Sequence, residues 1–167
     1  MLGLTPSQSA LVLLLFITPV CAWVVWSDLK TMKIPNRAVY ALVGVFFLVG
    51  PFVLPLDVWA WRLVHLPIIL MLGFVLNATL HFGAGDAKFA AAAAPFFSSN
   101  YSHLNLTIVL LAAFLLGAFT AHRLIRAIPA ARAMAPDWVS WQRADFPMGL
   151  ALVGTLWAYL AIITSAG

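Results

Sequence analysis

The sequence predicts an all-α polytopic membrane protein, and three observations support that prediction. Hydrophobic residues make up 64% of the 167 residues and charged residues only 8%, whereas soluble domains carry about 25% charged residues. Apolar segments long enough to span a bilayer follow one another without a long polar linker. The basic residues gather in alternate loops between these segments. The length suits a single transmembrane domain over residues 1–167.

Six apolar segments are expected to form transmembrane helices. They cover residues 10–26 with Pro19 inside, 38–54, 59–80, 87–97, 104–121 and 146–164. The fourth segment is short and rich in alanine, but small side chains let membrane helices pack closely. The predicted fold is therefore a bundle of six transmembrane helices.

The distribution of basic residues predicts the orientation of the bundle. With six spans, eight of the nine Lys and Arg residues fall on one side, and only Arg62 falls on the other. Without the fourth span the division is four against five. Because basic loops stay in the cytoplasm, we expect both termini outside and the three basic loops inside.

Composition also excludes several classes of protein. The net charge of +4 comes from loops beside apolar spans, which indicates contact with anionic membrane lipid rather than nucleic acid. Cys21 is a single cysteine in an apolar run, so no disulfide framework or zinc-ligand pair is expected. The four histidines, His65, His81, His103 and His122, show no metal-binding spacing. We expect no metal and no cofactor. No basic residue precedes the first apolar run, which favours a permanent span over a cleaved signal peptide.

Two acidic residues stand out because carboxylates near lipid are rare and usually functional. Asp28 follows the first predicted span and Asp86 precedes the fourth, so the six-span topology places both at the cytoplasmic face. Two adjacent carboxyl groups share a proton, which allows one to act as base and the other as acid. The alternative is structural: Asp28 would neighbour Lys30, and Asp86 would cap a helix.

The residues around the two acids suggest supporting roles. Gly83 and Gly85 flank Asp86 and are expected to adopt backbone angles closed to other residues, which would let a substrate chain approach. Lys88 would either favour ionised Asp86 or extend to lipid headgroups. Pro35 is expected to fix a turn, and Asn36 to cap the second helix. The dipole of the helix that follows predicts that Asp86 is the more ionised of the two acids. The segment His122–Asp145 mixes Arg with Trp and is expected in the membrane interface.

These features together resemble the type IV prepilin peptidases, which are intramembrane aspartic proteases of the GxGD type. Asp28 followed by Ile34-Pro35-Asn36, and then Gly83-Ala84-Gly85-Asp86-Ala87-Lys88, match the family's two signature regions in order. Pro147 and Gly149 resemble the P-x-G stretch that opens the last helix of the family. The resemblance covers essentially the whole chain and implies that Asp28 and Asp86 are the catalytic pair.

The resemblance implies cleavage of a short basic leader from a prepilin or pseudopilin, at the cytoplasmic face of the bacterial inner membrane. The substrate's apolar helix is expected to insert beside the segments 10–26 and 87–97. The chain lacks the paired cysteines of the larger members that also N-methylate their product, so it resembles the short peptidases of Tad/Flp-type pilus systems, and cleavage alone is expected. Archaeal preflagellin peptidases share the same plan.

Two functions from other classes compete with this interpretation. A proton-coupled transporter or channel subunit also uses buried aspartates, although both acids lie at one face here. A non-catalytic membrane protein of pilus assembly would use neither carboxyl group for chemistry.

Overall fold

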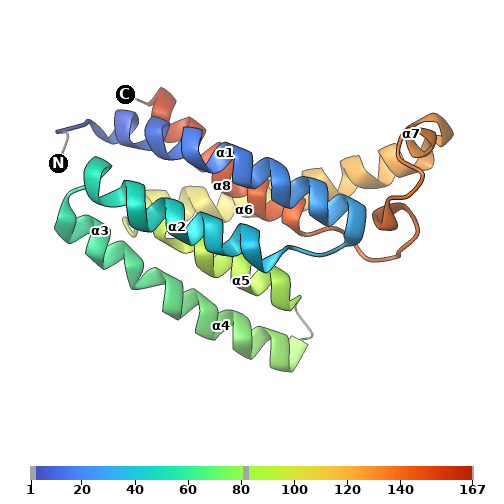
Figure 1. Ribbon diagram of the computed structural model, residues 1–167, viewed down its shortest axis with the longest axis horizontal. Coiled ribbons are helices and arrows are strands. Elements are labelled where there is room, and N and C mark those ends of the chain that lie inside the picture. The colour runs from blue at the N-terminus through green and yellow to red at the C-terminus, as the bar shows by residue number, and fades with distance from the viewer. Residues whose placement is uncertain (1–2, 81–82, 167) are drawn as a thin grey trace.

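The computed structural model describes residues 3–80 and 83–166, and it is helical throughout that part of the chain, without strands (Figure 1). The elements in chain order are α1 (Pro6–Thr31), α2 (Asn36–Val53), α3 (Leu56–Leu63), α4 (His65–Leu80), α5 (Ala84–Ala93), the 3-10 turn η1 (Ala94–Phe96), α6 (Tyr101–Ala127), α7 (Pro129–Met134), the 3-10 turn η2 (Val139–Trp141) and α8 (Gly149–Ser165). The predicted all-α fold is confirmed.

Helix α1 is longer than the segment 10–26 expected from hydropathy, because local signals extend both of its ends. Thr5 and Gln8 form a capping box, in which each side chain satisfies the other residue's backbone N–H. At the other end Met32 adopts a left-handed conformation with φ of 55°, and its N–H donates to the carbonyl of Asp28. The cap therefore places Asp28 inside the last turns of α1.

Prolines divide the remaining chain into helices. Pro35 and Pro55 are the N-caps of α2 and α3, and Pro129 is the first residue of α7. The span predicted over 59–80 is present as one apolar helical stretch, Leu56–Thr79, in which a turn at Val64 separates α3 from α4. The predicted loop after residue 121 is wrong in detail. Helix α6 continues to Ala127, and α7 and η2 follow it.

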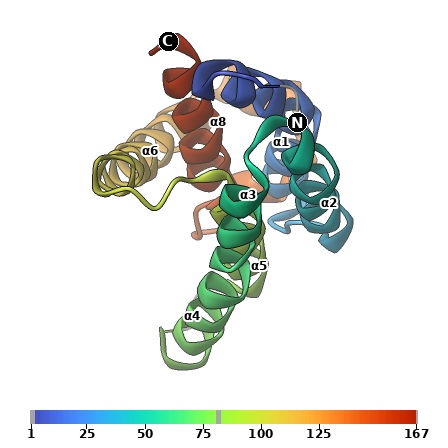
Figure 2. The same ribbon diagram turned by 90° about the vertical axis from the view of Figure 1, so that its left-hand side faces the viewer.

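The core lies where α1 packs against α8 and α2, and α5 closes it from the side facing α4. Figure 2 shows α4 next to α5, on the far side of the bundle from α1 and α8, and α6 beside α8. The most deeply buried large side chains are Leu13, Ile17, Val24, Leu42, Phe46, Phe89, Phe96 and Leu156. Helix α5 fits into this core because its residues Ala91, Ala92 and Ala93 are small and buried.

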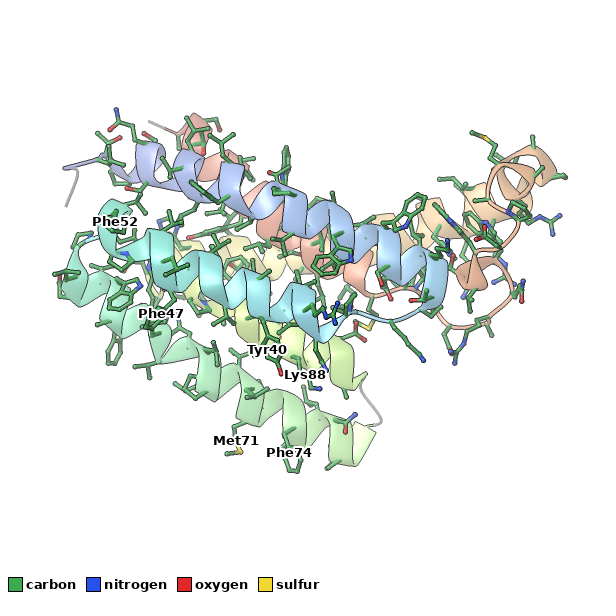
Figure 3. All side chains as sticks on the ribbon, viewed as in Figure 1. Tyr40, Phe47, Phe52, Met71, Phe74 and Lys88 are labelled. Carbon is green, nitrogen blue, oxygen red and sulfur yellow. The ribbon has the colours of Figure 1, made fainter. Side chains whose placement is uncertain are left out.

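The outer surface is apolar, as expected for a chain surrounded by lipid. Figure 3 labels five side chains of α2 and α4 that remain more than half exposed, namely Tyr40, Phe47, Phe52, Met71 and Phe74. Four helical stretches are long and apolar enough to cross a membrane: Pro6–Thr31, Asn36–Val53, Leu56–Thr79 and Tyr101–Ala127. Helices α8 and α5 are shorter, with 17 and 10 residues. The membrane class is therefore supported, while the six-span count and the orientation stay predictions.

Candidate active site

Asp28 lies near the end of α1 and is only 4% exposed. The backbone N–H of Gly149, the first residue of α8, donates a hydrogen bond to Oδ2 of Asp28 over 2.7 Å. A Cβ at position 149 would lie 2.7 Å from the same oxygen, so only glycine leaves room for this contact. The sequence indicated Gly149 as a supporting residue, and the structure shows what it contacts.

Asp86 lies in the first turn of α5, outside the four candidate spans, and is partly buried. Burial, and after it the negative charge of Asp28, raise the pKa of Asp86 from 3.8 to about 6. Asp86 does not cap the helix, because the N-cap residue is Gly83 and no side chain bonds to the cap. The structural alternative for Asp86 is therefore wrong.

Asp28 and Asp86 line one cavity of about 980 Å³ at the same end of the bundle. Its other lining residues come from the α1–α2 connection and the start of α2 (Met32, Lys33, Ile34, Asn36), the start of α5 (Gly83, Ala84, Gly85, Lys88), α6 (Leu115, Phe119) and the segment before α8 (Arg143, Asp145, Phe146, Met148). The site therefore combines carboxyl groups with an apolar wall from α6.

Asn36, next to Pro35, contacts Lys88 and does not cap α2 as expected. Asn36 is the first residue of α2 and makes no cap, so its predicted capping role is wrong. Its Oδ1 instead accepts a hydrogen bond from Nζ of Lys88 over 3.3 Å. Lys88 is labelled in Figure 3 beside the start of α2. The two signature regions of the sequence therefore meet, and they hold the first turn of α5 next to α2.

The two glycines before Asp86 have different surroundings. Neither has positive φ, so the predicted special backbone angles are wrong. A Cβ at Gly83 would overlap Oδ2 of Asp86, whereas a Cβ at Gly85 would lie 3.6 Å from the Cβ of Ile34, an ordinary contact. Gly83 is thus needed for space beside the Asp86 carboxyl group.

The segment between α6 and α8 forms one side of the cavity, whereas the sequence favoured a place in the membrane interface over a role in guiding the substrate. The Arg126 guanidinium donates to the carbonyl of Arg143 over 2.6 Å, and Arg123 donates to the carbonyl of Ala144. Lys30 pairs with Asp137 of this segment over 3.3 Å. Lys30 is therefore paired with Asp137 and not with its sequence neighbour Asp28. A pairing across more than one hundred residues leaves no local signal in the sequence.

The histidines do not gather at this site in the part of the chain that the structure describes. His103 bonds to the hydroxyl of Tyr159, near the cavity formed with Pro6 and Arg62. His122 is buried against Trp141 and Phe146. His81 lies outside the described residues. No group of three or more His, Cys or acidic side chains suited to a metal ion occurs within residues 3–80 and 83–166.

Fold and site together define a helical membrane protein with two carboxyl groups from separate helices in one cavity. A comparison with protein families matches residues 14–122, well over half of the chain, to the type IV leader peptidase family. The chain belongs to that family, which makes it a prepilin-type leader peptidase in general terms. Comparisons with curated proteins and with solved structures give no match.

Proposed function

We propose that the chain is an aspartic endopeptidase that removes the short basic leader of prepilin-like substrates. The reaction takes place at the cytoplasmic face of the bacterial inner membrane, and Asp28 and Asp86 carry it. One observation supports this assignment above all. The two carboxyl groups come from different helices, line one cavity, and are close enough for the charge of Asp28 to act on Asp86. Such a pair shares one proton, as aspartic peptidases require.

The surroundings of the two acids support different roles for them. Oδ2 of Asp28 accepts the Gly149 N–H at the start of α8, a bond that is strongest to a carboxylate. Because this hydrogen bond favours the ionised form of Asp28, the shared proton is held by Asp86, where burial and the charge of Asp28 favour the protonated form. We therefore assign Asp28 as the base and Asp86 as the acid. This reverses the assignment expected from the sequence, which did not include the Gly149 donor.

The reaction then proceeds in two steps. Asp28 takes a proton from a water molecule as the water oxygen attacks the carbonyl carbon of the leader's last residue, and Asp86 gives its proton to the carbonyl oxygen. The tetrahedral intermediate collapses as Asp28 passes its proton to the leaving nitrogen, and Asp86 recovers its proton from the hydroxyl. The products are a leader with a free carboxyl group and a mature protein with a new amino terminus.

The proposal includes cleavage without N-methylation by these 167 residues. Their single cysteine, Cys21, is buried in α1, so these residues do not supply the paired cysteines of the members that N-methylate. The mass of the mature substrate's first peptide checks this part of the proposal. An unmodified amino terminus is expected, and an added methyl group on product formed by the purified chain with a methyl donor would contradict it.

The central experiment compares three Asp→Asn variants in the cleavage of a prepilin by purified protein in detergent. Asp28→Asn and Asp86→Asn remove the proposed base and acid with little change of shape. Asp145→Asn is the matched control, since Asp145 lines the same cavity but is exposed and paired with Arg143 over 2.8 Å. We expect cleavage by the parent chain and by Asp145→Asn, and loss of cleavage in the other two.

The alternatives give other results in the same experiment. Cleavage by all variants would contradict the aspartic mechanism. Absence of cleavage by the folded parent chain on its own prepilin would favour a non-catalytic role or proton transport. Melting curves of all four proteins establish that each one is folded.

A further inference from the structure

Two cavities lie on the same side of the molecule, between α6 on one side and α4 with α5 on the other. The first is the cavity of the two acids, where Leu115 and Phe119 of α6 face the start of α5. The second has a volume of about 260 Å³ and lies toward the other end of the bundle. It is lined by α4 (His65, Ile68, Ile69), by Ala94 and Phe97–Ser99, and by α6 (Leu104, Thr107). Figure 2 shows α4 and α6 diverging on this side.

By helical spacing, residues of α5, η1 and α6 lie between the two cavities. On α5 and η1, Asp86, Ala90 and Ala94 follow at intervals of four residues and so share one face. On α6, Leu104, Ile108, Leu111 and Leu115 follow at intervals of three or four. The residues from Leu104 to Leu115 cover about 16 Å of helix. From this spacing these residues are expected to bound, with Ile68 and Ile69 of α4, one path between the two cavities, which we call the α5–α6 groove.

The groove suits an apolar helix. Its floor consists of alanines, which let another helix approach closely. Its α6 wall from Leu104 to Leu115 has no charged residue, and Lys88 bonds to Asn36 on the α2 side. Away from water a peptide must satisfy its backbone groups internally, and therefore enters such a groove as a helix.

We propose that the segment of the substrate that follows the cleaved bond docks as an apolar helix in the α5–α6 groove. This inference rests on the proposed peptidase function. The groove ends at Asp28 and Asp86, so a peptide cut there must continue either into the groove or out of the bundle. The leader lies on the amino-terminal side of the cut and is the part released. Because the leader is basic and the α6 wall of the groove carries no charge, the apolar side that follows the cut occupies the groove.

This position keeps the segment 87–97 that the sequence predicts beside the substrate, but it replaces the other predicted neighbour, the segment 10–26, with α6. Helix α1 packs against α8 and α2, and Asp28 is 4% exposed, so the approach to Asp28 along α1 is closed. The wall that faces the groove comes from α6 instead.

Neighbouring residues of α6 provide a matched test by photo-cross-linking. Ile108 and Val109 are 58% and 56% exposed, so lipid reaches both equally, but their side chains point about 100° apart. A photoreactive residue replaces one or the other in the Asp86→Asn background, which keeps a co-expressed prepilin uncut in bacterial membranes. We expect cross-links to the prepilin from position 108 and their loss at position 109. Cross-links from position 115 should map nearer the cleaved bond than those from position 104.

Equal cross-linking from positions 108 and 109, or none from either, would overturn the groove as the docking site and indicate that lipid fills it. Cleavage of the same prepilin by the parent chain is measured in parallel. Its absence would overturn the proposed function together with this inference, whereas cleavage combined with equal cross-linking would overturn the groove alone.

A second pair of variants tests the groove by its effect on catalysis. Ala90→Leu fills the floor of the groove, and Gly117→Leu adds similar bulk to α6 at a position with no atom within 4 Å of an added Cβ. We expect Ala90→Leu to raise the KM for the full prepilin about tenfold, equivalent to about 1.4 kcal/mol. Gly117→Leu should leave KM unchanged. An unchanged KM in both variants would contradict the docking site.

Discussion

At the scale of single residues, Gly83 and Gly85 both precede Asp86, but an added Cβ would overlap another residue only at Gly83. An added Cβ at Gly83 would overlap the Asp86 carboxyl group, which can rotate away, so the expected cost in stability is small. The rotation displaces a catalytic group by about 1 Å, so we expect Gly83→Ala to lower cleavage by about tenfold or more. Gly85→Ala should retain most activity. Rates of prepilin cleavage by the two purified variants measure this difference.

The comparison has a direct control in thermal stability. Both variants should unfold within a few degrees of the parent chain. Equal activity of Gly83→Ala and Gly85→Ala would contradict the role given to Gly83, because both substitutions add the same methyl group to the same turn.

The raised pKa of Asp86 predicts how cleavage depends on pH. Asp86 must hold a proton to act as acid, and its pKa is about 6. As pH rises through 6 that proton is lost, so cleavage should fall, approaching about tenfold per pH unit well above 6. A profile of kcat from pH 5 to pH 8 measures it. A kcat that rises steadily over this range would contradict the assignment of Asp86 as the acid.

The same pKa makes a prediction about stability. The folded value, about 6, lies above the ordinary value of 3.8, so the folded chain holds the extra proton between these pH values. The free energy of unfolding must therefore fall as pH rises from 4 to 6. Asp86→Asn removes this loss and should stabilise the chain above pH 6 but not at pH 4. Melting temperatures of the parent chain and of Asp86→Asn at pH 4 and pH 7 measure the change. A higher melting temperature of Asp86→Asn at pH 4 but not at pH 7 would contradict the prediction.

At the scale of elements, the contact between α4 and α5 sets the position of Asp86. Gly73 of α4 is buried, and a Cβ there would lie 2.7 Å from the Cβ of Ala87 and 3.3 Å from its Cα. Backbone has to move to accommodate Gly73→Ala, so we expect a loss of about 1–3 kcal/mol of stability and reduced cleavage, since Ala87 follows Asp86 directly. Thermal unfolding and cleavage assays measure both effects.

Gly44→Ala in α2 is the matched control for Gly73→Ala. No atom lies within 4 Å of an added Cβ at Gly44, and alanine favours a helix over glycine by up to about 1 kcal/mol. Equal stability of the two variants would show that the α4–α5 contact is looser than the structure describes.

The helices were largely predictable, and their ends and contacts were not. Hydropathy identified the apolar interiors, but it missed the capped turns at Thr5 and Met32 and the break at Val64. The two acids of the site were visible in the sequence as rare charged residues beside apolar runs, and Gly83 and Gly85 by their place next to Asp86. The donor from Gly149 to Asp28 and the wall from α6 were not, because they join residues far apart in the sequence. Only the folded chain brings them together.

At the scale of the whole molecule, α5 and η1 determine the topology. Together they span residues 84–96, about 20 Å of helix, which is shorter than a typical span. Nevertheless Asp86 lies at one end of the bundle, whereas Ser98 and Asn100 line a cavity with Pro6 and Leu54 at the other. The short helix thus connects the two ends of the bundle, which supports the six-span prediction.

Cysteine labelling in intact cells tests this topology. In a Cys21→Ala background, Tyr101→Cys and Met134→Cys place single thiols at residues that are 86% and 88% exposed. With six spans, a membrane-impermeant maleimide should label position 101 from outside and reach position 134 only after the membrane is permeabilised. If α5 does not cross, both positions change sides and the pattern inverts. The inverted pattern would also separate the basic segment that contains Arg143 from the cytoplasm, against the positive-inside rule. The comparison therefore decides whether α5 crosses the membrane, and so whether the Arg143 segment lies on the same side as the carboxyl pair whose cavity it lines.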